Sequence, residues 1–64
     1  MMTKTIKNQI TAINESGETD MLDLQTVRHI ADREHFLDLL SYLNAEPAEY
    51  WHYIMTKDVP ILDA

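Results

Sequence analysis

Acidic side chains and histidines are the residues of this 64-residue chain that could carry chemistry. The stretch GETDMLD, residues 17–23, holds the single glycine and three carboxylates. A calcium loop of the EF-hand type needs oxygen ligands at alternate positions, a glycine at its sixth position and a glutamate at its twelfth. Here the glycine comes first, and Met21 and Leu22 occupy the middle. The pattern therefore favours a capped helix corner over a cation site.

The remaining residues suggest no catalytic or metal centre. His29, His35 and His52 form no i, i+4 pair, whereas metal sites usually need three or four convergent ligands. The chain has no cysteine nucleophile, no GxSxG, no phosphate-binding glycine loop and no HExxH. We therefore predict that the protein is not an enzyme and that it has no catalytic residues, no metal and no cofactor.

The charge of the chain is acidic and unevenly distributed. Eleven acids against five bases give a formal net charge of -6, yet the first 14 residues carry Lys4 and Lys7 and no acid. Few, scattered bases argue against direct binding to a phosphate backbone, because each neutralised phosphate needs a Lys or Arg. An acidic body suits a basic partner, including the nucleic-acid groove of a protein; simple solubility is the other interpretation.

Hydrophobic spacing predicts how these residues are positioned. Stripes at helical spacing mark four short helices, in TKTIKNQITAINES (3–16), LQTVRHIADRE (24–34), HFLDLLSYLN (35–44) and AEPAEYWHYIMTK (45–57). Pro47 suits a first helical position, so a break falls between Asn44 and Pro47. We predict an all-α fold, a compact bundle of about four short helices. Residues 1–56 form one helical domain and residues 57–64 form an extended C-terminal tail.

The corner between the first two helices has its own local signals. Gly17 follows a periodic segment, where a left-handed residue commonly ends a helix. Asp23 is placed to cap the next helix, and Leu22 and Val27 are spaced as a hydrophobic staple. We predict that Gly17, Leu22, Asp23 and Val27 form a structural corner. Glu18, Asp20 and Met21 stay open as contacts for a partner.

Some apolar residues have no obvious place in so small a core. We expect Tyr50 and Trp51 to be buried, which leaves over Leu37, Tyr42, Tyr53, Met55, Val59, Ile61 and Leu62. Aromatics and methionine beside acids are typical of protein contact surfaces. The candidate partner-binding residues are the acids Asp32, Glu34, Asp38, Glu46 and Glu49, with Leu37, Tyr42 and Tyr53 as apolar anchors.

The order of these residues resembles a family of small phage and prophage proteins catalogued as a domain of unknown function. The resemblance covers about residues 6–56. A Thr-Asn-Met-Phe-Asp-like box reads Thr-Asp-Met-Leu-Asp here (19–23), and a closing Tyr-x-x-Phe-Ile-Leu-Thr-Gly-like stretch reads Tyr-Trp-His-Tyr-Ile-Met-Thr-Lys (50–57). The chain departs from the pattern at Asp20, Leu22 and Lys57, in place of Asn, Phe and Gly, and at His35, where a glycine is expected. The family supplies no catalytic residues.

These features lead to three hypotheses about function. The first is a phage-encoded module that binds and modulates or inhibits a host protein, such as a nucleic-acid-binding nuclease of a defence system. The second is a homodimer or accessory subunit of a phage machine. The third is helix-turn-helix DNA binding through residues 24–44, which is disfavoured because Asp38 would repel phosphates. No apolar run approaches the roughly 20 residues of a membrane span and no signal peptide is recognisable, so we expect a protein of the host cytosol.

Overall fold

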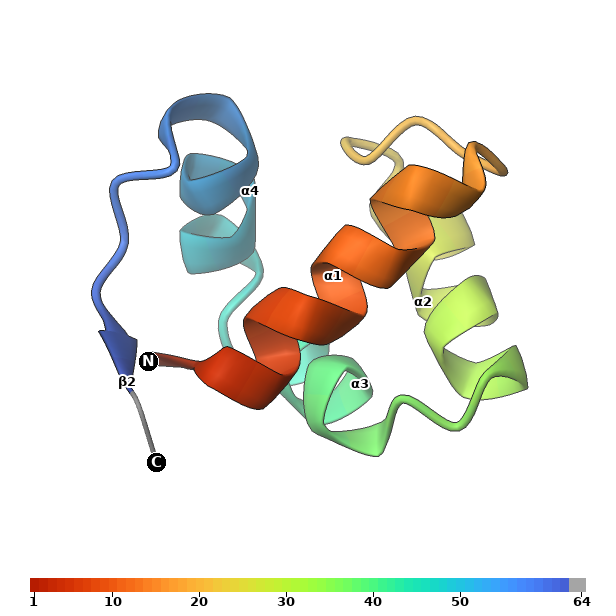
Figure 1. Cartoon of the computed structure of the whole chain (residues 1–64), viewed down its shortest axis with the longest axis horizontal. Coiled ribbons are helices and arrows are strands. Elements are labelled where there is room, and N and C mark those ends of the chain that lie inside the picture. Colours follow the sequence, from red (N-terminus) through yellow and green to blue (C-terminus); the bar gives the residue numbers. More distant parts are fainter. Residues whose placement is uncertain (63–64) are drawn as a thin grey trace.

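Four short helices form the fold, with two very short strands beside them. The computed structural model describes residues 1–62, and its elements are β1 (Met2–Thr3), α1 (Lys4–Ser16), α2 (Leu24–Arg33), α3 (Leu37–Ala45), α4 (Pro47–Thr56) and β2 (Ile61–Leu62). α3 packs against each of the other helices, while α2 and α4 lie on opposite sides of α1 (Figure 1). The predicted all-α bundle of four helices is confirmed.

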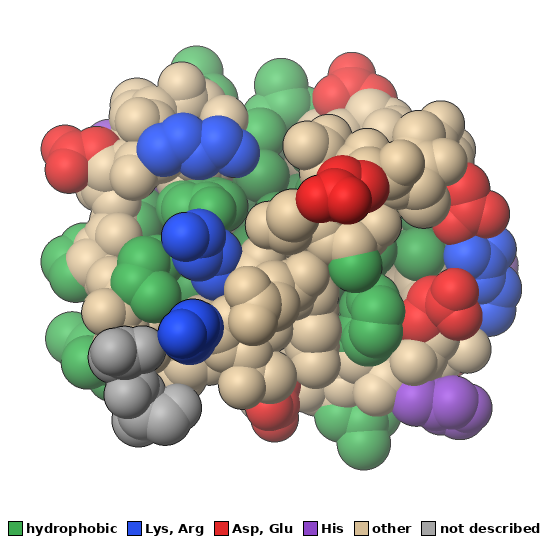
Figure 2. Space-filling model, viewed as in Figure 1, with side chains coloured by type: hydrophobic (Ala, Val, Ile, Leu, Met, Phe, Trp, Pro, Cys, Tyr) green, Lys and Arg blue, Asp and Glu red, His purple; other side chains and the backbone are tan. Residues whose placement is uncertain are grey.

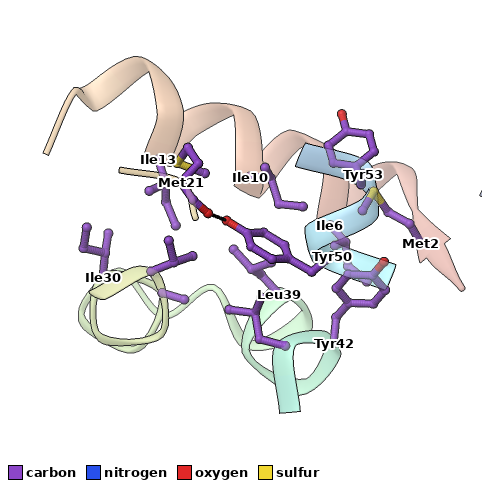
Figure 3. Packing of buried hydrophobic residues seen from close by; sticks show 13 residues of the cluster. Met2, Ile6, Ile10, Ile13, Met21, Ile30, Leu39, Tyr42, Tyr50 and Tyr53 are labelled. Carbon is purple, nitrogen blue, oxygen red and sulfur yellow. Dashed lines mark hydrogen bonds between the residues drawn. The ribbon is translucent and has the colours of Figure 1, made fainter. Parts of the chain in front are cut away.

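The core draws on every helix and on two methionines outside the helices. Its buried hydrophobic residues are Met2, Ile6, Ile10, Ile13, Met21, Val27, Ile30, Ala31, Leu39, Tyr42, Leu43, Tyr50 and Tyr53. Figure 3 shows Tyr50 reaching from α4 toward Met21, to whose backbone oxygen its hydroxyl donates a hydrogen bond at 2.5 Å. A buried phenol needs such a partner, because an unpaired hydroxyl in the core costs about 1–3 kcal/mol. The bond therefore fixes α4 against the corner between α1 and α2.

The predicted C-terminal tail is extended but not free. After α4 it returns to the start of the chain, where Ile61 and Leu62 pair in parallel with Met2 and Thr3. Figure 1 shows the N-terminus beside β2. A strand of two residues has no sequence periodicity of its own, so the pairing was not predicted. Residues 63 and 64 of the expected tail lie outside the described part of the chain.

The corner between α1 and α2 confirms two of the local predictions and corrects one. Gly17 ends α1 with φ 69°, and the Asp23 carboxylate caps α2 by accepting from the backbone N–H of Thr26 at 3.3 Å. The expected staple between Leu22 and Val27 is wrong, because Leu22 is about half exposed whereas Val27 is fully buried. Met21 enters the core in its place, since the turn points its side chain inward.

Two long-range hydrogen bonds satisfy the ends of α3. No side chain at its N-cap accepts a bond, and the backbone N–H of Leu39 instead donates to Oε1 of Gln9 in α1 at 3.0 Å. At the other end the Arg28 guanidinium of α2 donates to the Leu43 carbonyl at 3.3 Å. A cation there also suits the negative end of the helix dipole. The central helix is therefore capped by its two neighbours.

Two helices end on a non-glycine residue with positive φ. His35 (φ 57°) follows α2, and the N–H groups of His35 and Phe36 donate back to Asp32 and Ala31 in a Schellman arrangement. Lys57 (φ 60°) ends α4 in the same left-handed conformation. A side chain with a Cβ is strained there by about 1–2 kcal/mol, and glycine avoids this strain. His35 and Lys57 are also the two positions at which the resemblance led us to expect a glycine.

We expect His35→Gly to stabilise the protein by about 0.5–1 kcal/mol, because glycine relieves the left-handed strain more than it adds chain entropy. The matched control is Gly17→Ala, which should destabilise the protein by about 1 kcal/mol, because alanine is strained in the left-handed conformation. An added Cβ would meet no atom within 4 Å, so this backbone strain is the only effect expected. Urea unfolding followed by circular dichroism measures both changes. A loss of stability in His35→Gly would show that the imidazole itself holds the turn.

Candidate functional site: an acidic groove beside α3

A surface groove of about 500 Å³ separates the start of the chain from one face of α3. Asp38, Ser41, Tyr42 and Ala45 line it at the i, i+3, i+4 and i+7 spacing of a single helical stripe. Met1, Thr3 and Ile6 form the facing wall, and Glu46 closes one end. We call this feature the acidic groove. It brings together three of the predicted partner-binding residues, namely Asp38, Tyr42 and Glu46.

Two carboxylates at one end of the acidic groove hold a cation. The N-terminal ammonium of Met1 lies 3.2 Å from Oε2 of Glu46 and 3.5 Å from Oε1 of Glu49. The Tyr42 hydroxyl donates to the same Glu49 oxygen at 2.8 Å. Glu49 is a fourth predicted partner-binding residue at this site, and it comes from α4, whereas the groove itself lies along α3. The arrangement is that of an ammonium site with an oriented carboxylate.

The hydrogen bonds of this cluster favour a charged Glu49 carboxylate and protonated donors around it. The bond from Tyr42 is the largest cause that lowers the pKa of Glu49, and the nearby ammonium lowers it further. Burial, and then the bond to Glu49, raise the pKa of Tyr42, so the phenol keeps its proton. The hydrogen bond to Glu46 raises the pKa of the Met1 amine. Glu49 therefore stays negative beside the ammonium.

The other candidate acids lie around the turn between α2 and α3. Asp32, Glu34 and Asp38 are exposed, and Leu37 beside Asp38 exposes 64% of its surface, as expected for an anchor. Glu34 lies 3.6 Å from Nη2 of Arg33, which binds Glu18 more closely at 2.6 Å. Asp32 and Glu34 do not line the groove. Only Asp38 links this turn to the acidic groove.

The structure corrects the assignment of the aromatic residues. Tyr42 and Tyr53 were expected outside the core, yet they are only 5% and 6% exposed. Trp51 was expected inside and is 45% exposed. The inward stripe of α4 is Tyr50 and Tyr53, which places Trp51 about 100° away on the outer face. Because three of the four residues 50–53 are aromatic, the sequence did not show which of them face the core.

Two searches of the described residues, 1–62, bear on other classes of function. They contain no cluster of three or more His, Asp or Glu side chains arranged to bind a metal ion. Their helices are all too short or too polar to cross a membrane.

Comparison with known proteins identifies a family. The family described as Domain of unknown function (DUF5049) matches residues 2–58, which spans all four helices. No curated protein and no solved structure matches the chain.

Removing the Tyr42 hydroxyl by Tyr42→Phe should raise the pKa of Glu49 toward its ordinary value of 4.5, which an NMR titration of the carboxyl carbon measures. Because the folded-state pKa of Glu49 lies below the unfolded value, its stabilising effect is present above the unfolded pKa. That effect is lost as the pH falls through the folded pKa. The variant should therefore lose stability relative to the wild type at neutral pH, and the difference should narrow in acid.

Tyr53→Phe is the matched control, because Tyr53 makes no hydrogen bond through its hydroxyl to any described residue. It should leave the pKa of Glu49 unchanged. If the pKa of Glu49 is unchanged in Tyr42→Phe too, the Tyr42 hydroxyl does not lower it, and the ammonium of Met1 does so alone.

Proposed function

The chain belongs to the family of the Domain of unknown function (DUF5049), and from this premise we propose that it is a small acidic protein-interaction module. The proposed contact is the acidic groove beside α3, and the proposed partner is a protein with a basic surface. The observation that carries the proposal is the ammonium of Met1, seated between Glu46 and Glu49. A lysine side chain presents the same chemical group.

The groove has room for more than one basic residue. Asp38 lies in the first turn of α3 and Glu46 is the residue that follows this helix, eight residues later, which separates them by about 12 Å. In an extended peptide, side chains three or four residues apart are separated by about 10–13 Å. Tyr42 and Ile6 between the acids offer apolar surface to the aliphatic stems of Lys or Arg. The preferred segment would therefore be extended, with basic residues at that spacing.

Charge and apolar contact would contribute differently to such a complex. Opposite charge mainly speeds association, whereas buried anchors hold the complex together. Leu37 is the anchor that best fits this role, because it is exposed directly beside Asp38. The exposed face of α3 has no basic residue, which disfavours the alternative of DNA binding through α2 and α3.

The resemblance to small phage and prophage proteins gives this proposal its biological setting. In that setting the partner is a host protein, and binding modulates or inhibits it. A nucleic-acid-binding nuclease of a defence system fits well, because its substrate groove must be basic. Occupation of such a groove by an acidic protein would exclude the nucleic acid.

The proposal is tested on the partner recovered by pull-down from the native host and identified by mass spectrometry. We expect Asp38→Lys combined with Glu46→Lys to slow association by about tenfold at low salt and to flatten its salt dependence. Glu15→Lys on the exposed face of α1 is the control; a single reversal away from the groove should have a much smaller effect. An unchanged association rate in the groove variant rejects the site.

A second candidate function, assembly as a homodimer, is favoured by an exposed strip on α4. Trp51 and Met55 are one turn apart on its outer face, and Met55 is 74% exposed. Large apolar side chains of this type are enriched in the centres of interfaces. Two copies of α4 could cover each other's strips.

If the strip forms a homodimer, sedimentation equilibrium should give twice the 7.5 kDa of one chain. Trp51→Ser should then return the protein to a monomer, whereas Leu37→Ser should leave the dimer intact and weaken only binding to the foreign partner. A monomer at every concentration tested eliminates the obligate dimer.

A further inference from the structure

A second cavity, of about 450 Å³, lies between α1, the corner after it and the end of α4. Ile10 and Tyr53 contribute apolar surface, and Thr11, Asn14 and Thr19 contribute polar groups. The two segments that carry the family resemblance, residues 19–23 and 50–57, both line it. The hydrogen bond from Tyr50 to Met21 holds those segments together. The volume is within the range of about 300–1,000 Å³ typical of small-molecule sites.

Lys57 is the cation of this cavity, and its position is unusual. Its backbone is left-handed, with φ 60°, where a glycine would be unstrained. Its ammonium lies 4.7 Å from the centre of the Tyr53 ring. No carboxylate of residues 1–62 pairs with it, although the chain has eleven acids and five bases. The left-handed conformation itself is that of a helix end, as at His35, so it is the unpaired charge that distinguishes Lys57.

Three of the five bases of the chain belong to α1 and to the residue that ends α4. Figure 2 shows Lys and Arg side chains gathered over the half of this face that holds α4 and the start of α1. The basic residues of those elements and of the residue that ends α4 are Lys4, Lys7 and Lys57. Such a local field favours an anionic group on a ligand.

Asp20 is the one acid that lines the same cavity. Its Oδ1 accepts from the Leu22 backbone N–H at 2.9 Å, and Oδ2 makes no hydrogen bond to another described residue. A purely anionic ligand would be repelled by Asp20, and a purely cationic one by Lys57. A ligand that carries both charges would satisfy both side chains.

We propose that this cavity binds a small zwitterion of the amino-acid class. The carboxylate of the ligand pairs with Lys57, its ammonium pairs with Asp20, and its side chain lies against Ile10 and Tyr53. Thr11, Asn14 and Thr19 supply hydrogen bonds around the charged groups. This site is separate from the acidic groove and does not depend on the proposed protein partner.

The test is an NMR titration of the ¹⁵N-labelled chain with four probes: L-leucine, N-acetyl-L-leucine, L-leucinamide and inorganic phosphate. We expect leucine to shift the amides of Thr11, Asn14 and Thr19 saturably. N-acetyl-leucine, which lacks the ammonium, should bind at least fivefold more weakly, and leucinamide, which lacks the carboxylate, should not bind. Absence of leucine binding overturns the proposal. The proposal is also overturned if leucinamide binds as tightly as leucine, or if phosphate binds and leucine does not.

Three variants separate a role in binding from a role in folding. Lys57→Gly removes both the charge and the strain, so it should abolish leucine binding while it raises the melting temperature by about 4 °C. Lys57→Gln keeps the strain and should also lose binding, without the gain in stability. Lys57→Arg should retain binding within about threefold. Undiminished binding in Lys57→Gln overturns the assignment, whereas Asp38→Lys in the acidic groove should leave leucine binding unchanged.

Discussion

The hydrogen bond between Tyr50 and the carbonyl of Met21 is the constraint on which both surface sites depend. α4 has its main helix contacts with α3 alone, so packing leaves it some freedom to rotate. A fully buried phenol removes that freedom, because only one rotation brings its hydroxyl to a free carbonyl. In this rotation Glu49 meets Tyr42 at the acidic groove, and Tyr53 and Lys57 border the second cavity. The same rotation leaves Trp51 and Met55 outside.

The separation of charge follows from the way the helices are arranged. The N-terminal bases Lys4 and Lys7 lie on α1, and Lys57 at the end of α4 lines a cavity together with residues of α1. The acids of α3 and of the start of α4 converge instead on the ammonium of Met1. A chain with a formal net charge of -6 therefore presents an acidic groove and a cavity lined by one acid and one base. The two sites suit ligands of different charge, and this is why we treat them as independent.

Local sequence signals predicted the helices well, and tertiary contacts decided the rest. Helical spacing identified the inward stripes of α1 and α2, and Gly17 and Asp23 act as their chemistry suggests. The caps of α3 were unpredictable, since Gln9 and Arg28 come from other helices. The acids that line the groove or its end were predicted from their charge alone, and only the fold brings Asp38, Glu46 and Glu49 near one another. Tyr42 was predicted to be an exposed anchor, but it is buried and lines the groove.

The two strained helix ends differ in what accompanies the strain. His35 and Lys57 both occupy left-handed positions, and a 64-residue domain has little stability to spare for either. A glycine in place of His35 could form the same backbone hydrogen bonds of the Schellman turn. It would also leave the packing of Phe36 unchanged. Glycine could not replace the ammonium of Lys57 over the Tyr53 ring, an interaction of about 0.5–1 kcal/mol at an exposed site. That interaction offsets part of the strain and holds the charge at the rim of the cavity. The backbone alone accounts for the turn at His35, whereas the side chain is what distinguishes Lys57.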